Sequence, residues 1–197
     1  MARTLLRLSL FVLFLAAPCL AQQAPAWEVF GGYSFERSNA REYYKSTPVI
    51  YTFRDRYLNL DGWELSLSEN SNANNWFGGT LQLTGHYKTP VVLGTTNRER
   101  MFSILYGPRF SHRMTWGTAF SHILFGAGRA TVTVSPGPHA SETSFAVAAG
   151  GGLDVNLGGR AAIRVLQVQY SPTNQIGGKK HQYQASAGIV FHLGKTK

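Results

Sequence analysis

The sequence predicts an all-β protein, an eight-stranded antiparallel up-and-down transmembrane β-barrel. Three observations support this: stretches of about ten residues alternate apolar and polar side chains, long and short connections alternate between them, and aromatic residues gather at their ends. The 197 residues are 13% aromatic and only 15% charged, which excludes a disordered chain. A single cysteine excludes a disulfide scaffold and a cysteine-ligated zinc site.

Residues 1–21 have the features of a cleaved signal peptide. Two arginines precede an apolar run of ten residues, and small residues lead to a cleavage point after Ala21. Lipidation at Cys19 is disfavoured by the proline before it. Residues 22–197 then form the outer-membrane barrel domain, which we expect to engage the export and barrel-assembly machinery. The mature chain has 17 basic and 10 acidic residues. Because the chain is expected to be exported, anionic lipid is a better partner for the excess of basic residues than nucleic acid.

Eight stretches are long enough and alternate well enough to be barrel strands, in which successive side chains point to opposite faces. In order, they are Trp27–Glu36, Leu60–Glu69, Trp76–Lys88, Arg100–His112, Trp116–Ala130, Thr143–Leu157, Arg160–Ser171 and Gln182–Leu193. Each exceeds the roughly 5–6 residues usual in globular strands. Apolar residues share one face in the second, third, sixth and eighth stretches: Trp63, Leu65 and Leu67; Phe77, Leu81, Leu83 and Tyr87; Phe145, Val147, Leu153 and Val155; and Tyr183, Ala185, Ala187, Ile189 and Phe191.

Two stretches depart from the alternation. In Arg160–Ser171, Arg164 shares its parity with apolar residues, and a bulge near Val165 would return it to the polar face. In Trp116–Ala130, Phe120 and His122 share one face with a leucine.

Alternation leaves open which face is inside, since a soluble lipocalin-type barrel has the same pattern. Connection length favours the membrane barrel. The connections after the first, third, fifth and seventh strands have about 23, 11, 12 and 10 residues, whereas the others have 6, 3 and 2. Long external loops, short periplasmic turns and both termini on the short-turn side would produce this alternation.

Aromatic residues at the strand ends indicate two belts, as expected at two membrane–water interfaces. The belt near the short turns contains Trp27, Trp76, Trp116 and Phe191, and the opposite belt contains Tyr87, Tyr170 and Tyr183, with Tyr57 at the same level.

The polar face carries three acidic and three basic residues, Glu28, Glu64, Lys88, Arg109, Asp154 and Arg164. Since an eight-stranded barrel is filled by side chains and buried charges must be paired, we expect Glu28, Glu64, Arg109, Asp154 and Arg164 to form a luminal charge network that plugs the barrel. A gated ion path through this network is the alternative interpretation.

Basic residues in the long connections form a candidate phosphate-binding rim for lipopolysaccharide, because Arg and Lys bind phosphate well. They are Arg41, Lys45, Arg54, Arg56, Arg98, Arg100, Lys179 and Lys180. Ordinary solvated loops would carry the same charges.

No catalytic, cofactor-binding or metal-binding residues are predicted. Ser111–His112 and Ser121–His122 are neighbours on a strand, so each pair points to opposite faces and needs a cross-strand partner to act as nucleophile and base. His86, His112, His122 and His192 have no recognised ligand spacing.

Six local motifs carry a family resemblance: FGGYSF (30–35), YGPRFSHR (106–113), FSHILFGAGRA (120–130), GGGLDV (150–155), IRVLQVQYSPT (163–173) and SAGIVFHLG (186–194). With them, the chain resembles the small eight-stranded outer-membrane barrels related to the OmpA transmembrane domain and OmpX, and especially an uncharacterised bacterial subgroup. The resemblance implies a monomer in the bacterial outer membrane with a structural or adhesive role, displaying basic surface loops. The alternatives are a narrow low-conductance channel, a lipid-modifying barrel enzyme and a soluble periplasmic lipocalin-like binder.

Overall fold

The structure, a computed structural model, describes most of the chain after the predicted signal peptide. The described residues are 25–46, 50–71, 76–89, 91–92, 95–135, 139–158, 160–175 and 178–194. The predicted signal peptide, residues 1–21, lies outside them. In the described part, no helix is long and apolar enough to cross a membrane.

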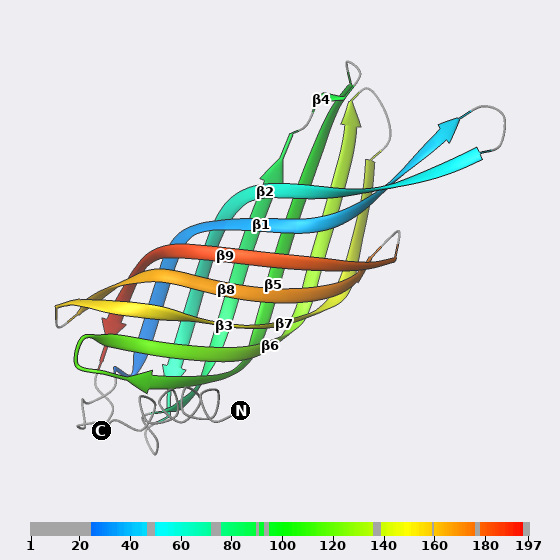
Figure 1. The fold of residues 1–197 in the computed structure, drawn as a ribbon. Coiled ribbons are helices and arrows are strands. Elements are labelled where there is room, and N and C mark those ends of the chain that lie inside the picture. Colours follow the sequence, from blue (N-terminus) through cyan, green and yellow to red (C-terminus); the bar gives the residue numbers. More distant parts are fainter. Residues whose placement is uncertain are drawn as a thin grey trace, which may run out of the picture.

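Antiparallel strands close into a barrel, which confirms the predicted fold (Figure 1). The strands are β1 (Trp27–Ser46), β2 (Ile50–Asn70), β3 (Phe77–Lys88), β4 (Val91–Val92), β5 (Thr95–Arg113), β6 (Gly117–Ser135), β7 (His139–Gly158), β8 (Ala161–Gln175) and β9 (Gly178–Leu193). Sequence neighbours pair except β3 and β4, β1 pairs with β9, and β3 pairs with β5 to close the wall. The two-residue β4 pairs only with β5, so eight long strands form the barrel.

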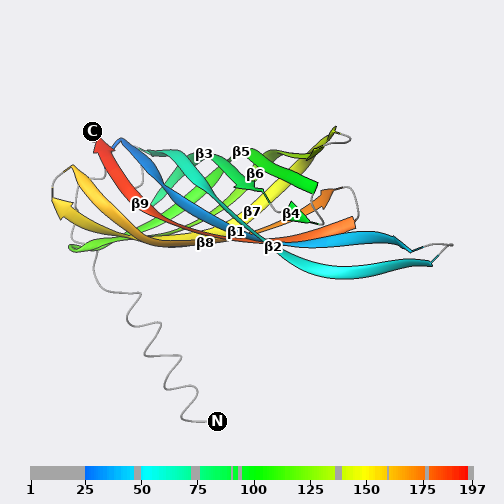
Figure 2. The ribbon, with the colours of Figure 1, turned by 90° about the horizontal axis from the view of Figure 1, so that it is seen from above.

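The long connections are the part of the fold that the sequence analysis had wrong. The segment expected as a loop of about 23 residues is mostly a continuation of β1 and β2, which stay paired out to Ser46 and Ile50. The pairing of β1 with β9 ends at Ser38. Beyond it, β1 and β2 stay paired with each other and continue past the barrel wall as an arm (Figures 1 and 2). Backbone groups in this segment are thus satisfied by a strand ladder, where the sequence analysis expected solvated loops. β5, β6 and β7 are extended at the same end.

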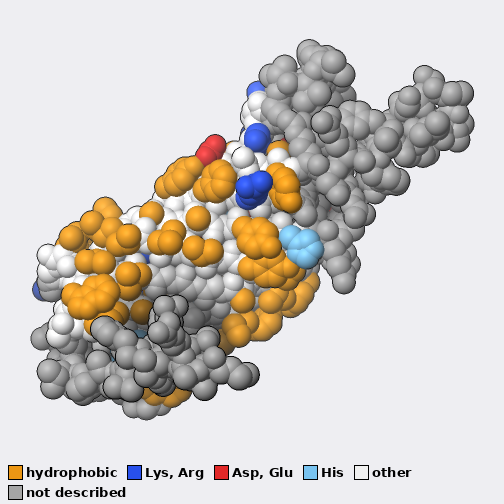
Figure 3. Space-filling view, in the orientation of Figure 1, with side chains coloured by type: hydrophobic (Ala, Val, Ile, Leu, Met, Phe, Trp, Pro, Cys, Tyr) orange, Lys and Arg blue, Asp and Glu red, His pale blue; other side chains and the backbone are white. Residues whose placement is uncertain are grey.

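The exposure of the strand side chains shows which side of the barrel wall is apolar. Large apolar side chains point outward and are exposed, as in Leu65, Phe125 and Phe145, the last 69% exposed. Polar side chains point into the lumen and are buried, as in Gln82 and Ser186. Figure 3 shows hydrophobic side chains spread over the visible part of the barrel wall, with Lys and Arg gathered near the arm end. This is the inverse of a soluble barrel.

Both irregular strands fit this arrangement. Leu153 pairs with Leu166 and Asp154 pairs with Arg164, so Val165 is the extra residue of a β-bulge. The predicted bulge is therefore confirmed, and it leaves Val165 and Leu166 both outside while Arg164 is buried inside. In β6, the apolar residues Phe120 and Leu124 face the lumen together with His122.

Candidate functional site

The centre of the lumen holds a chain of ion pairs contributed by four strands. Arg109 on β5 lies 2.7 Å from Glu28 on β1 and 3.6 Å from Asp154 on β7, measured between nitrogen and carboxylate oxygen. Arg164 on β8 donates two hydrogen bonds to Asp154, at 2.8 and 3.0 Å. All four side chains are buried. Charge pairing of this kind is what makes buried ions tolerable in a protein interior.

Two luminal phenylalanines belong to the same cluster. The guanidinium carbons of Arg109 and Arg164 both lie 4.3 Å from the centre of the Phe120 ring, and that of Arg164 lies 4.2 Å from the centre of the Phe30 ring. Such stacking is stronger in desolvated sites. The arginines therefore explain why aromatic residues occupy an otherwise polar face.

Glu64 joins the ion-pair chain through hydrogen bonds from uncharged side chains, and not through an ion pair with an arginine. Its carboxylate accepts hydrogen bonds from Gln167 at 2.8 Å, Gln184 at 2.9 Å and Ser186 at 2.6 Å. Gln167 in turn accepts one from Arg164 at 2.7 Å. The expected network thus reaches Glu64 through the Gln167 amide, and the amides and hydroxyl supply the donors that its buried charge requires.

Arg113 is a member of this network that the sequence analysis missed. It donates to Glu28 at 2.9 Å and to Asn70 at 2.8 Å, and Asn70 donates to the carbonyl of Pro25 at 2.8 Å. The predicted strand ended one residue earlier, at His112. Extending its alternation by one position would have placed Arg113 on the luminal face with Arg109.

A second polar chain lies nearer the arm end. Glu36 and His86 Nδ1 are 3.2 Å apart, His86 Nε2 is 2.9 Å from Ser34 Oγ, and Ser34 Oγ is 3.1 Å from Ser186 Oγ. The pairing registers place Gly62 of β2 between Ser34 and His86. Because Gly62 has no side chain, the imidazole can extend across β2; a Cβ there would lie 2.7 Å from His86 Cδ2.

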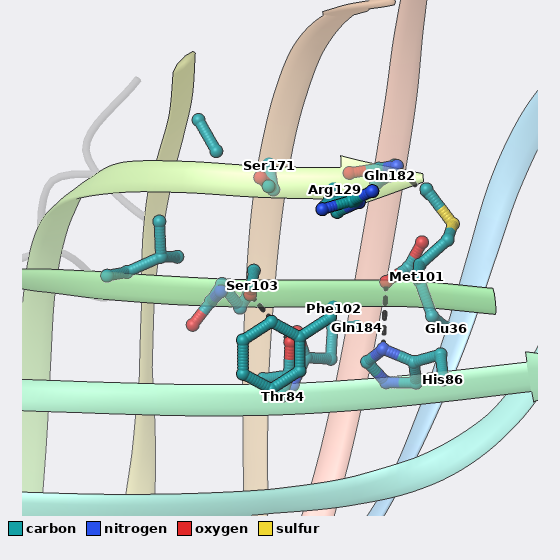
Figure 4. A pocket seen from close by; sticks show the side chains of 14 residues that line it. Glu36, Thr84, His86, Met101, Phe102, Ser103, Arg129, Ser171, Gln182 and Gln184 are labelled. Carbon is teal, nitrogen blue, oxygen red and sulfur yellow. Dashed lines mark hydrogen bonds and ion pairs between the residues drawn. The ribbon is translucent and has the colours of Figure 1, made fainter. Parts of the chain in front are cut away.

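This cluster borders a small cavity of about 30 Å³ in the arm-end half of the barrel (Figure 4). Glu36, His86, Gln182 and Gln184 line it on one side. The opposite wall has small or apolar residues, including Gly128 and Ala146. Among the central charges, the gaps between side chains are too small to hold a water molecule. Within the described part of the chain, the amide of Gln82, which borders these gaps, has no hydrogen-bond partner.

Ser34, His86 and Glu36 have the connectivity of a nucleophile, a base and an orienting carboxylate. Ser34 is fully buried and is not among the residues that line the cavity next to His86. The two sequence-adjacent Ser–His pairs point to opposite faces, with Ser111 and His122 buried and Ser121 exposed. Among the described residues, no group of three or more His, Cys, Asp or Glu could hold a metal ion.

The residues proposed for the aromatic belts lie on the outside of the barrel, and Trp76 and Trp116 lie in the turns just before β3 and β6. Six of them are exposed by 43–55%: Trp27, Trp76, Trp116, Phe191, Tyr87 and Tyr183. Tyr170 is half-buried, because its ring packs against Tyr183 and its hydroxyl is 2.6 Å from His181. Trp76 stacks on Phe110 with ring centres 5.9 Å apart.

Of the proposed basic rim, the structure describes the side chains of Arg98 and Arg100, and both are exposed. The other members have strand backbones, but their side chains lie outside the described residues: Arg41, Lys45, Arg54, Arg56, Lys179 and Lys180. Arg37, at the base of the arm, lies with its guanidinium carbon 4.3 Å from the centre of the Tyr57 ring.

No protein-family model matches the chain, and no curated protein matches its sequence. Solved structures match its fold. Ail, the attachment invasion locus protein of Yersinia pestis, is 18% identical, with a TM-score of 0.55 over 85% of this chain and 99% of Ail. Neisserial surface protein A is 11% identical, with a TM-score of 0.63 over 87% of this chain and all of that one. The outer membrane protein OprG of Pseudomonas aeruginosa is 13% identical, with a TM-score of 0.51 over 88% of this chain and 98% of OprG. The chain therefore has the fold of the small eight-stranded outer-membrane β-barrels.

Proposed function

We propose that this protein spans the bacterial outer membrane and has a structural and adhesive role there. The observation that carries the proposal is the inside-out distribution of side chains: an exposed apolar wall around a lumen of buried, paired charges. In lipid, a closed barrel satisfies every backbone hydrogen bond. In water, exposing the apolar side chains of this wall would cost free energy.

The filled lumen supports a structural role. The ion pairs and stacked arginines join β1, β5, β6, β7 and β8 across the barrel centre. A narrow low-conductance channel is the second candidate, favoured by the charged and polar side chains that line the lumen. Single-channel recording in planar bilayers separates the two, because a plugged barrel gives no conductance steps.

The arm and the rim support the adhesive role. Arg41, Lys45, Arg54 and Arg56 belong to the arm strands, beyond the point at which β1 leaves β9. Guanidinium and ammonium groups bind phosphate and other anionic groups. We propose that they contact lipopolysaccharide phosphates at the cell surface, with the barrel acting as a monomer.

Two measurements test this function. The refolded chain from residue 22 should migrate on a gel as a compact species that shifts only after boiling, and it should float with lipid vesicles. A chain that stays soluble without detergent and shows no shift would refute the membrane barrel.

The adhesive part is tested by binding of the barrel to purified lipopolysaccharide. Replacing the four arm cations together with glutamine should weaken binding, and added salt should weaken wild-type binding as well. The matched control exchanges arginine for lysine and lysine for arginine at the same four positions, which leaves the charge unchanged. Equal binding by the two variants would refute the role of the arm charges.

A further inference from the structure

Three arginines gather on the outer face of β5 and β6, at the arm end of the barrel. Arg98 and Arg100 belong to β5 and Arg129 belongs to β6, and all three side chains are exposed. They share the outward face of Phe102, which follows Arg100 by two positions and lies directly opposite Arg129. The sequence analysis did not assign Arg129 to the basic rim, so this grouping appears only once the strands are paired.

The pairing register places the three side chains within reach of one another. Arg100 lies directly opposite Thr131, which is two positions from Arg129 on the same face. Residues in this diagonal relation are about 7–8 Å apart. Arg98 is two positions from Arg100 along β5, about 7 Å away. Arg100 therefore stands between two further cations, and an anion above it can contact at least two guanidinium groups.

Carboxylates do not neutralise these arginines. Among the residues that the structure describes, none of the three arginines forms an ion pair. Glu99 and Glu142 occupy inward-facing positions of β5 and β7, because outward and inward residues alternate along each strand. Asp61 faces outward in the same row as Arg100 but lies two strands away, with Tyr87 between them. The outer face at this point is therefore basic.

Hydroxyl groups accompany the arginines on the same face. Thr131 lies opposite Arg100, and Ser141 on β7 lies opposite Thr131. Ser141 accepts a hydrogen bond from Arg129 Nη2 at 3.2 Å, which uses one of the five N–H groups of that guanidinium. The cluster thus offers positive charge together with additional hydrogen-bond donors, the combination that suits a phosphate group.

The height of the cluster matches one edge of the apolar wall. Arg100 is ten positions from Phe110, which stacks on Trp76 near the short turns. Ten positions span about 33 Å along a strand, or about 25 Å along the barrel axis at the usual tilt of about 40°, which equals the height of the apolar band in such barrels. The exposed apolar residues between them include Phe102, Ile104 and Tyr106. The arginines therefore lie at the depth of lipid headgroups on the arm side.

We propose that Arg98, Arg100 and Arg129 bind a phosphate monoester on the sugar backbone of lipid A, the membrane anchor of lipopolysaccharide. A phosphate monoester carries about −1.5 to −2 charges at pH 7, whereas the phosphodiester of a phospholipid carries a single negative charge. Several guanidinium groups with no neighbouring carboxylate match the more highly charged group, and their planar forks fit its oxygens.

The inference rests on the proposed function, which places lipopolysaccharide on the arm side of the membrane. It adds a defined site for one part of that molecule. The barrel wall itself holds the lipid anchor through these three arginines, independently of the cations on the arm.

Native mass spectrometry of the chain refolded from residue 22 tests the inference. The protein in detergent is incubated in turn with phosphorylated lipid A, with dephosphorylated lipid A and with phosphatidylglycerol. Wild type should retain phosphorylated lipid A about tenfold better than the other two lipids, as several exposed charge-assisted contacts give together. Equal retention of the two forms of lipid A would overturn the inference. Equal retention of phosphatidylglycerol would show a general phosphate site and would overturn the assignment to lipid A.

Variants locate the site. Arg100→Gln should weaken retention of phosphorylated lipid A about fivefold, because Arg100 lies between the other two cations. Replacing all three arginines with glutamine should reduce retention to that of the dephosphorylated form. Arg160→Gln makes the same exchange at an exposed position in the turn between β7 and β8, at the opposite end of the barrel, and should behave like wild type. Equal retention by the triple variant and Arg160→Gln would refute the site.

The variant that lacks the four arm cations separates this inference from the proposed function. If that variant loses binding to whole lipopolysaccharide while the triple variant still retains lipid A as wild type does, the proposed function stands and this inference falls. A wild-type chain without the heat-dependent gel shift overturns the membrane function itself. If the triple variant fails to refold, the single variants at Arg98, Arg100 and Arg129 decide in the same way.

Discussion

Replacing Asp154 with asparagine should destabilise the barrel strongly. Asp154 accepts two hydrogen bonds from Arg164 and lies 3.6 Å from Arg109. The amide keeps the shape but removes the negative charge, so two guanidinium groups lose a counter-charge in a closed lumen. Loss of one partner from a buried ion pair costs about 3–5 kcal/mol. Because Arg109 keeps Glu28 at 2.7 Å, the lower end of that range is expected.

The assay is urea unfolding of the refolded barrel in vesicles, followed by the unboiled gel band and by tryptophan fluorescence, with free energies from linear extrapolation. Asp61→Asn makes the same chemical change on the outer wall and should leave the midpoint near that of wild type. A double-mutant cycle with Arg164→Gln isolates the pair. An Asp154→Asn midpoint that matches the Asp61→Asn midpoint would refute the claim that the luminal charges hold the barrel together.

Three further perturbations have defined outcomes. Phe120→Ala should cost about 3–5 kcal/mol in the same assay, because it opens a cavity between two stacked guanidinium groups; a loss below about 1 kcal/mol would show that the stacking contributes nothing. Gly62→Ala should shift the imidazole resonances of His86 and lower the unfolding midpoint, since the new Cβ would lie 2.1 Å from the Gly85 carbonyl oxygen and 2.7 Å from His86 Cδ2, and unchanged spectra would contradict this. Deleting Val165 should preserve the heat-dependent gel shift, because the bulge residue is removed and Arg164 still faces inward. Deleting Val168 reverses the faces on one side of the cut and should abolish the shift; equal behaviour of the two deletions would refute the assigned bulge.

Residue parity explains how far the sequence could predict this fold. In a strand with one apolar face, the period of two fixes every side chain once one is placed, so Leu65 and Gln82 could be assigned to opposite faces. The same rule located the bulge at Val165, since Arg164 would otherwise face lipid. It failed at the strand ends, because the segment after Glu36 mixes charged and aromatic residues on both faces and gives no clear alternation.

The contacts inside the lumen could be predicted only in part. Charge type placed Arg109, Asp154 and Arg164 in one network, because each is expensive to bury alone. Sequence has no information on cross-strand register, however, so the link from Glu64 through Gln167 could not be predicted. The Ser34–His86 contact was equally hidden, because it depends on Gly62 in the intervening strand.

The contact between Glu64 and Ser186 has a consequence for how the chain enters a membrane. These residues are 122 positions apart in sequence, and they meet only after the last strand has joined the first. Until then, Glu64 lacks Gln184 and Ser186, and the luminal charges line one face of an open sheet without a closed wall around them, although Asp154 and Arg164 already face each other on adjacent strands. Non-local contacts of this kind form late in folding. Partly inserted forms are therefore penalised, and insertion and closure are expected to proceed as one cooperative step that is completed by β9.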